Sequence, residues 1–266
     1  MIFSLRNFRV QTLRISQSNV REYNEIIRKT YNLYCSIFED IEFKTFERSI
    51  FLRGSVTYVA IYSDKQSRLL GFTAFSFQEF FISGKKHVAI NGGNYFTLGS
   101  KMGPISLVYP LFAALRYKLF NPFSKLNYIT TCCSAGAYHL LASMTHRTYP
   151  NPNYSTSDEI HTLLIEAMKS RNKKIVDEKR LLVFDKSRSS LRFKEKAKYA
   201  KSISSSPYKS YFQLQNPDLG NRYYMAVCVP LDFVSICMSL INTITYSKMK
   251  QRAKSSIAKD DRLGEI

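Results

Sequence analysis

The pattern of hydrophobic and polar positions predicts a run of strands, followed by helices that alternate with one more strand. Three stretches rich in β-branched and aromatic residues are separated by short polar turns, which is typical of an antiparallel meander. Two apolar stretches of helical length follow, with a further strand-like stretch between them. The expected strands are Thr57–Ser63, Leu69–Ile82, His87–Leu98 and Leu126–Cys133, and the expected helices are Ile105 to about Leu119 and Ala135 to about Thr145.

The first fifty residues predict a strand and an amphipathic helix. Phe8 to Ile15 alternates apolar and polar residues, which indicates an edge-type strand. Asn19 followed by Glu22 resembles a capping box, and the helix after it carries one apolar stripe at three- and four-residue spacing. The stretch from Ile41 to Leu52 is ambiguous.

An almost wholly apolar stretch, Tyr223–Tyr246, is long enough to cross a bilayer. Pro230 and Asp232 fit poorly in an isolated spanning helix. We therefore expect a buried strand up to Val229, a break at Pro230, and a helix from about Asp232 that this side chain caps. On this interpretation residues 1–246 form a single domain.

The chain is strongly basic, with 39 Lys and Arg against 20 Asp and Glu and a formal net charge of +19. This balance favours anionic partners, namely nucleic acid, anionic lipid, an acidic carrier protein or phosphate-bearing ligands. Between Lys169 and Lys201 there are 13 Lys and Arg against 4 acids. We expect a basic insertion at about 169–205, either a solvated segment or a docking surface for an acidic partner or a membrane. The basic stretch 247–266 is expected to be a disordered tail.

The cysteines indicate a reducing compartment. The chain has 5 of them, an odd number, and most lie in apolar stretches. That usage is typical of buried thiols in a cytoplasmic protein. No CxxC pair is present, so we expect no structural zinc and no metal. The first residues contain Arg6 and Arg9 and no long apolar run, unlike a secretory signal.

Two groups of glycines could carry chemistry. Gly92-Gly93 interrupts a strand, which predicts either a simple bulge or a place where neighbouring strands part, so that an extended ligand could bond to free amides. The loop from Gly99 to Gly103, followed by Pro104, offers unobstructed amides at a helix N-terminus. Lys101 adds a point charge suited to a phosphate.

Three short segments carry a resemblance to a known family. They are Tyr128–Leu141 (YITTCCSAGAYHLL), Thr148–Pro152 (TYPNP) and Gln215–Gly220 (QNPDLG), the last leading into Tyr224–Pro230. With the order of the elements, these segments resemble the GNAT (Gcn5-related N-acyltransferase) superfamily, and more specifically a little-characterised GNAT-like branch. The resemblance covers roughly residues 57 to 230. It implies an α+β fold, in which a mixed, mostly antiparallel sheet is flanked by helices on both faces, and a cleft for an acyl thioester.

The resemblance also implies which residues hold the donor. In the family, the loop after the fourth strand binds the pantetheine and pyrophosphate of acyl-CoA with the pattern Arg/Gln-x-x-Gly-x-Gly/Ala. The expected binding residues here are Gly99, Ser100, Lys101, Met102 and Gly103, together with Ser134. The loop lacks the first Arg or Gln, and Pro104 replaces a small residue and removes one amide donor.

The expected catalytic residues are Tyr138 and Glu79. Tyr138 matches the family's tyrosine that protonates the leaving thiolate, although a helix tyrosine that packs at the sheet edge remains the alternative. Glu79 lies on the long strand and could act as base through water if it faces the cleft. Cys132 and Cys133 are expected to be inert thiols, because nothing nearby in the sequence would activate them.

We therefore expect an acyltransferase that moves an acyl group from acyl-CoA or an acyl-carrier protein to an amine or hydroxyl. The apolar helix and the phenylalanine-rich strand favour a medium or long acyl chain. The alternative is an inactive GNAT-like module that binds an anionic membrane, an acidic protein or nucleic acid through Lys169–Lys201. Nucleic acid ranks below the others, because few aromatic residues lie among the basic ones. For both functions we expect a cytoplasmic protein, and peripheral attachment to a membrane is left open.

Overall fold

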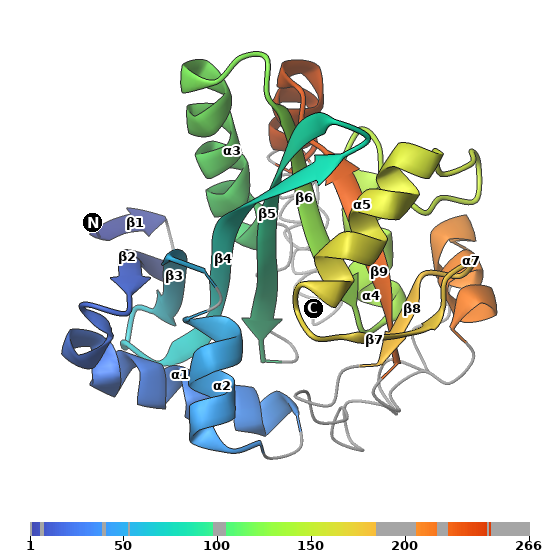
Figure 1. Cartoon of the computed structure of the whole chain (residues 1–266). Coiled ribbons are helices and arrows are strands. Elements are labelled where there is room, and N and C mark those ends of the chain that lie inside the picture. Colours follow the sequence, from blue (N-terminus) through green and yellow to red (C-terminus); the bar gives the residue numbers. More distant parts are fainter. Residues whose placement is uncertain are drawn as a thin grey trace, which may run out of the picture.

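The computed structural model describes residues 2–5, 8–38, 41–52, 54–97, 105–184, 206–216, 223–243 and 245. They contain a nine-stranded sheet with the order β1-β2-β3-β4-β5-β6-β9-β8-β7 (Figure 1). Only the β5–β6 pair is parallel among these strands. The strands are β1 Ile2–Leu5, β2 Phe8–Ser16, β3 Val56–Asp64, β4 Leu69–Ile82, β5 Lys85–Phe96, β6 Lys125–Cys132, β7 Lys174–Asp177, β8 Leu182–Phe184 and β9 Tyr223–Pro230.

Helices cover both faces of the sheet, because its strands bury side chains on both sides. On one face α1, α2 and α5 pack over the even-numbered residues of β4, such as Phe72 and Phe80. On the other face α3, α4, α7 and the helical residues 233–243 pack around Phe75 and Ile90. The helices are α1 Asn24–Ile37, α2 Phe43–Ile50, α3 Val108–Phe120, α4 Ala135–Met144, α5 Asp158–Lys169 and α7 Pro207–Gln215, with 3₁₀ turns at η1 Val20–Tyr23 and η2 Ile105–Leu107. The expected α+β class, a mostly antiparallel sheet flanked by helices, is confirmed.

The central elements lie close to where the sequence predicts them. β4 has the predicted bounds, and β3, β5, β6 and α4 differ from prediction by only one or two residues at their described ends. The turn between β3 and β4 is closed by Asp64, whose carboxylate accepts bonds from the amide and the guanidinium of Arg68, at 2.8 and 2.6 Å. β4 and β5 then pair from Ile82–Lys85 to Gly71–Phe96.

Several expectations for the N-terminal part need correction. The strand at Phe8–Ser16 is not an edge, because β1 pairs with its outer side. Asn19 does not cap a helix; its Oδ1 accepts the amide of Ser16 at 2.8 Å, and α1 begins only after η1. The ambiguous stretch contains α2, whose Phe46 is fully buried.

The basic segment is partly built into the sheet. β7 and β8 form a hairpin within it, and β8 pairs with β9, so these strands end the sheet on that side. The sequence predicted only an insertion here, because both strands are short, with four residues in β7 and three in β8. The rest of the insertion, 185–205, and the tail 247–266 lie outside the described residues.

The apolar stretch near the C-terminus is a strand, a break and a helix, as predicted. β9 is buried over most of its length and ends at Pro230. The carboxylate of Asp232 accepts the amide of Ser235 at 2.6 Å, which caps the helical residues 233–243. Of the helices that the structure describes, none combines the length and the apolar character that a bilayer crossing requires.

Candidate functional site

The parallel strands β5 and β6 part halfway along their length. Their pairing runs from His87–Lys125 to Asn91–Ile129 and stops there. Residues 92–96 of β5 and 130–132 of β6 continue beyond that point. One side-chain bond spans the start of the gap, since Thr130 Oγ1 donates to the carbonyl oxygen of Gly92 at 2.9 Å. The predicted parting of the strands beside the glycine pair is thus confirmed for the described residues.

The predicted bulge at Gly92-Gly93 is wrong. These residues pair in regular register with Phe75 and Ala74 of β4. Glycine is needed for space instead, because a Cβ on Gly92 would lie 2.6 Å from the Cβ of Phe75. A Cβ on Gly93 would lie 2.5 Å from the hydroxyl oxygen of Tyr95. A side chain at Gly92 would therefore push against β4 itself, whereas one at Gly93 would require the ring of Tyr95 to move.

The gap is lined by main-chain donors of β5. The carbonyl of Gly92 points towards β6, and the amide of Thr97 points the other way, to Leu70 beside β4. In a strand, the N–H and C=O of one residue share a side, and the sides alternate along the chain. The N–H groups of Asn94 and Phe96 therefore face the gap, beyond the last ladder pair with β6. They form a short row of donors that an extended ligand could use.

A cavity of about 300 Å³ occupies this gap. Its walls come from the free ends of β5 and β6, from η2, from the start of α4 and from the end of α1, which places it between the two layers of helices. Apolar side chains such as Ile37, Leu107 and Leu140 line much of it, and Asn94, Thr130 and Thr131 add polar groups. This mixture is typical of a site for an organic ligand with a few polar anchors.

The N-terminus of α4 closes one side of the cavity. Ser134 caps this helix, and its Oγ accepts the amide of Ala137 at 3.1 Å. The amides of Ala135 and Gly136 lie in the same first turn, where the helix itself supplies no acceptor. Ser134 and Gly136 both line the cavity, so its wall carries the positive end of the helix dipole. Ser134 is the expected binding residue that the structure places in this cavity.

Arg171 holds the fork where β5 and β6 part. Its guanidinium donates to the side-chain oxygen of Asn91 and, at 3.1 Å, to the carbonyl of Ile129, the last paired residues of the two strands. The buried Lys173 beside it lies 3.4 Å from Thr131 Oγ1. Sequence reasoning missed both roles, because nothing in the spacing separates these residues from the other cations of the basic segment.

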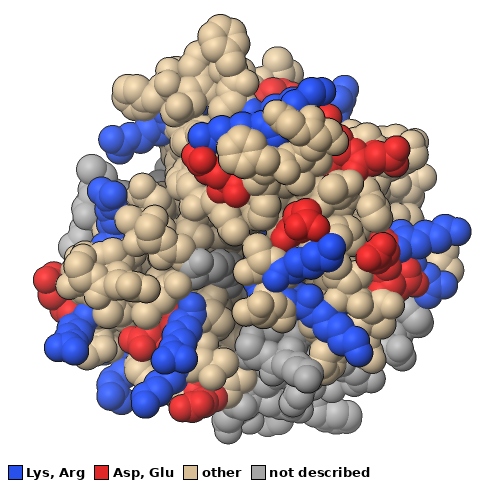
Figure 2. Space-filling model, viewed as in Figure 1, with Lys and Arg blue, Asp and Glu red and all other residues tan. Residues whose placement is uncertain are grey.

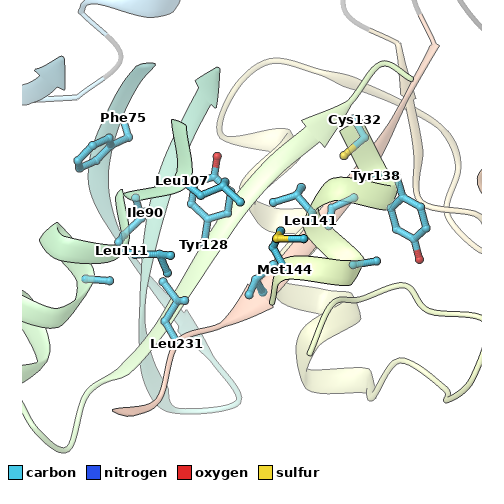
Figure 3. Packing of buried hydrophobic residues seen from close by; sticks show 14 of the residues in the cluster. Phe75, Ile90, Leu107, Leu111, Tyr128, Cys132, Tyr138, Leu141, Met144 and Leu231 are labelled. Atoms are coloured by element: carbon cyan, nitrogen blue, oxygen red, sulfur yellow. The ribbon is translucent and has the colours of Figure 1, made fainter. Parts of the chain in front are cut away.

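Tyr138 lies apart from the cavity. It is fully buried, and its hydroxyl donates to the carbonyl of Pro150 at 2.7 Å. Its ring stacks on Phe212, and burial raises the pKa of the phenol well above its usual range. Figure 3 shows the ring across Leu141 from Tyr128. These are the contacts of a helix tyrosine that packs beside the sheet, which is the alternative given in the sequence analysis. The role of general acid stays a prediction, and the geometry does not support it.

Of the other expected residues, Glu79 lies away from the cavity, and those of the loop from Gly99 to Gly103 lie outside the described residues. Glu79 stands near the β4–β5 hairpin with a side chain 56% exposed, and it pairs with Lys86 at 2.7 Å. It is thus remote from the end of β5 that borders the cavity. The loop from Gly99 to Gly103 is outside the described residues, so its part in binding stays a prediction.

Tyr128 is a candidate that sequence reasoning overlooked. It lies on β6, lines the cavity and is buried (Figure 3). Burial raises the pKa of its phenol to about 12, and a hydrogen bond with Thr130 partly opposes that shift. Because Thr130 in turn bonds to Gly92, the phenol belongs to a polar chain that reaches the fork. The alternation of β6 was the available signal, since Tyr128 and Thr130 share one face of the strand.

Comparison with family models finds no match, and comparison with curated proteins finds no significant one. Several solved structures match, among them the GCN5-related glucosamine N-acetyltransferase region of a fungal multi-domain GH3 β-N-acetylglucosaminidase. That match has 13% sequence identity and a TM-score of 0.28, and it covers 63% of this chain and 17% of the other. A likeness this distant carries no argument about what the chain does.

Proposed function

We propose that the cavity between β5 and β6 binds the extended arm of an acyl thioester, and that the chain transfers the acyl group to an amine or hydroxyl. The donor would be acyl-CoA or an acyl-carrier protein. The observation that carries the proposal is the parting of two parallel strands after Asn91 and Ile129, which leaves main-chain donors facing a cavity of about 300 Å³.

The arm of such a donor suits this gap. Pantetheine is a narrow, extended chain with amide groups, so it can lie beside β5 as an additional strand would. The N–H groups of Asn94 and Phe96 would bond to its carbonyls. The N-terminus of α4, capped by Ser134, would favour negative charge on the donor. We propose that the loop from Gly99 to Gly103 adds further contacts to the phosphates.

The reaction itself needs little more than orientation and a hydrogen-bond donor. The acceptor nitrogen or oxygen attacks the thioester carbonyl carbon, the C–S bond breaks, and the thiolate receives the proton that the acceptor loses. A phenol with a pKa of about 12 stays protonated at neutral pH. It is a weaker acid than a thiol of pKa about 8.5. Tyr128 would therefore stabilise developing negative charge by hydrogen bonding rather than by complete proton transfer.

The acyl group would enter a small apolar pocket next to the main cavity. This pocket has a volume of about 20 Å³ and shares Leu107, Tyr128 and Leu141 with the main cavity. A void of that size is close to that of a single water molecule. A medium or long chain therefore requires Leu107 or Leu141 to move, whereas a short chain does not.

The test is binding and turnover with acyl-CoAs of increasing chain length. Calorimetry measures affinity, and mass spectrometry detects acyl transfer to a panel of amines and alcohols. Gly136→Phe would fill the cavity from the first turn of α4 and should abolish binding. Gly136→Ala is the matched control, because a Cβ there meets no atom within 4 Å. Equal binding by both variants, or no binding of any thioester by the wild type, would contradict the proposal.

A further inference from the structure

In the helical residues 233–243, polar side chains are buried and apolar ones are exposed, which is the reverse of an ordinary surface helix. Their inner face carries hydroxyl side chains beside the buried Ile236, with Ser235 and Ser239 completely buried. Their outer face is apolar, with exposed fractions of 64% at Val234, 41% at Met238 and 56% at Ile241. The outer residues follow a spacing of four and three, which makes one continuous stripe. A surface helix normally places such a stripe against the core.

Helix α3 extends this apolar surface. Its outer side and the turn after it expose large side chains, namely Phe112, Leu119, Phe120 and Phe123. Both helices pack on the same core cluster, through Leu111 and Ile236, so their outer sides face away from the same side of the sheet. They are also adjacent, since Lys118 Nζ lies 5.6 Å from the centre of the Phe233 ring. We call the exposed side chains of α3, its following turn and residues 233–243 the apolar helix face.

The chain as a whole carries a formal charge of +19, although Asp232 stands exposed at the start of residues 233–243. No acidic residue occurs between Glu79 and Asp158, a stretch that includes the whole of α3. Arg116 stands exposed on α3 between Phe112 and Leu119. Further along the sequence, SKMKQRAK at positions 247–254 contains only basic charges, and these positions lie outside the described residues. By contrast, Figure 2 shows cations and carboxylates interspersed on the side of the molecule that carries α1, α2 and α5.

We propose that the apolar helix face docks on an anionic lipid bilayer, with its aromatic and aliphatic side chains in the headgroup layer and Arg116 on the lipid phosphates and carboxylates. Apolar side chains beside Lys and Arg are what an interfacial helix requires. A second copy of the chain fits less well, because each copy carries a formal charge of +19 and the two would repel. The exposed side chains project outward from two helices and do not line the cavities described above. Such projecting side chains can insert into the headgroup layer of a bilayer.

This inference is independent of acyl transfer, and vesicle flotation of the full chain tests it. We expect binding to vesicles of phosphatidylcholine with phosphatidylserine, weaker binding in high salt, and little binding to phosphatidylcholine alone. Replacing one apolar anchor by a polar residue should weaken binding about tenfold. The double variant Val234→Asn/Ile241→Asn should therefore lose about a hundredfold. Leu214→Asn is the matched control, because Leu214 is 73% exposed but lies on α7.

A fluorescent probe reports docking directly, because the chain contains no Trp. Met238→Trp should shift its emission to the blue when phosphatidylserine vesicles are added, and Leu214→Trp should not. Thermal unfolding of each variant confirms that the fold is kept. The proposal is overturned if the wild type does not float, or if the double variant floats equally well. It is also overturned if sedimentation without lipid shows a dimer that the double variant dissociates.

Discussion

Gly92 is tightly enclosed by neighbouring atoms, whereas Gly136 faces open space. The same substitution to alanine should therefore change the free energy of unfolding in opposite directions at the two positions. A methyl group on Gly92 would lie 2.6 Å from the Cβ of Phe75 and 2.9 Å from the carbonyl oxygen of Ala74. Favourable contacts between carbon atoms lie at about 3.5–4.0 Å, so β4 would have to shift. Overpacking of this kind costs about 1–3 kcal/mol. The conformational advantage of alanine, about 0.5–1 kcal/mol, offsets only part of that cost.

At Gly136 the same methyl group meets no atom within 4 Å. Alanine is more favourable than glycine inside a helix by about 0.8–1.0 kcal/mol, and the first turn should show part of that gain. We therefore expect Gly92→Ala to lower the free energy of unfolding by about 1–2 kcal/mol and Gly136→Ala to raise it by about 0.5 kcal/mol.

Urea unfolding of the two variants beside the wild type measures both changes. The slope of the unfolding free energy against urea should stay the same, so that the midpoints report stability alone. If Gly92→Ala were as stable as the wild type, β4 and β5 would not be held as close together as the structure indicates. The steric explanation of the glycine pair would then be wrong, and with it the account of why the strand keeps this sequence at the fork.

Three further expectations concern single side chains. Tyr138→Phe removes the hydrogen bond to Pro150 and should destabilise the fold by about 1–2 kcal/mol. The rate of acyl transfer and its pH profile should stay the same. A rate that falls without loss of stability would instead support the role of Tyr138 as general acid. Tyr128→Phe should lower kcat by about a hundredfold with little change in KM, and an unchanged kcat would exclude Tyr128 from the reaction. For His87, burial lowers the pKa despite the nearby Glu159, so the unfolded chain binds the proton more readily than the folded one. Stability should therefore fall as the pH drops below about 6.5, and His87→Gln should reduce that dependence in urea unfolding at a series of pH values; a stability that is flat or rising over this range would contradict the pKa direction.

Local patterns were sufficient for most elements of the fold. β4 could be bounded to the residue because a polar turn stands at each end and its apolar residues are continuous. The strand, break and helix near the C-terminus could be predicted because Pro230 ends one pattern and Asp232 begins the next. β7 and β8 were missed because both are short, and they are held in place by their pairing with each other and by the pairing of β8 with β9.

The candidate site also has parts that the sequence could predict and parts that it could not. The parting of the strands beside Gly92 was one of the two alternatives that the glycine pair left open, although the bulge expected there is absent. The partners of Tyr138 could not be predicted. Its helix position was correct, but only the packing of α4 against α7 directs the hydroxyl to Pro150. Arg171 is a similar case, because its bonds to Asn91 and Ile129 join residues far apart in the chain.

Periodicity, turn residues and charge are local properties, so the order of most of the strands and helices and the basic character of the chain can be read from the residues alone. Contacts between distant segments are not local, because many residues of the same type compete for each position and packing selects among them. That selection directs Tyr138 away from the cavity, brings Tyr128 to its wall and carries Arg171 to the fork. It also turns the apolar stripe of residues 233–243 outward, which the hydrophobic pattern of that helix would not predict.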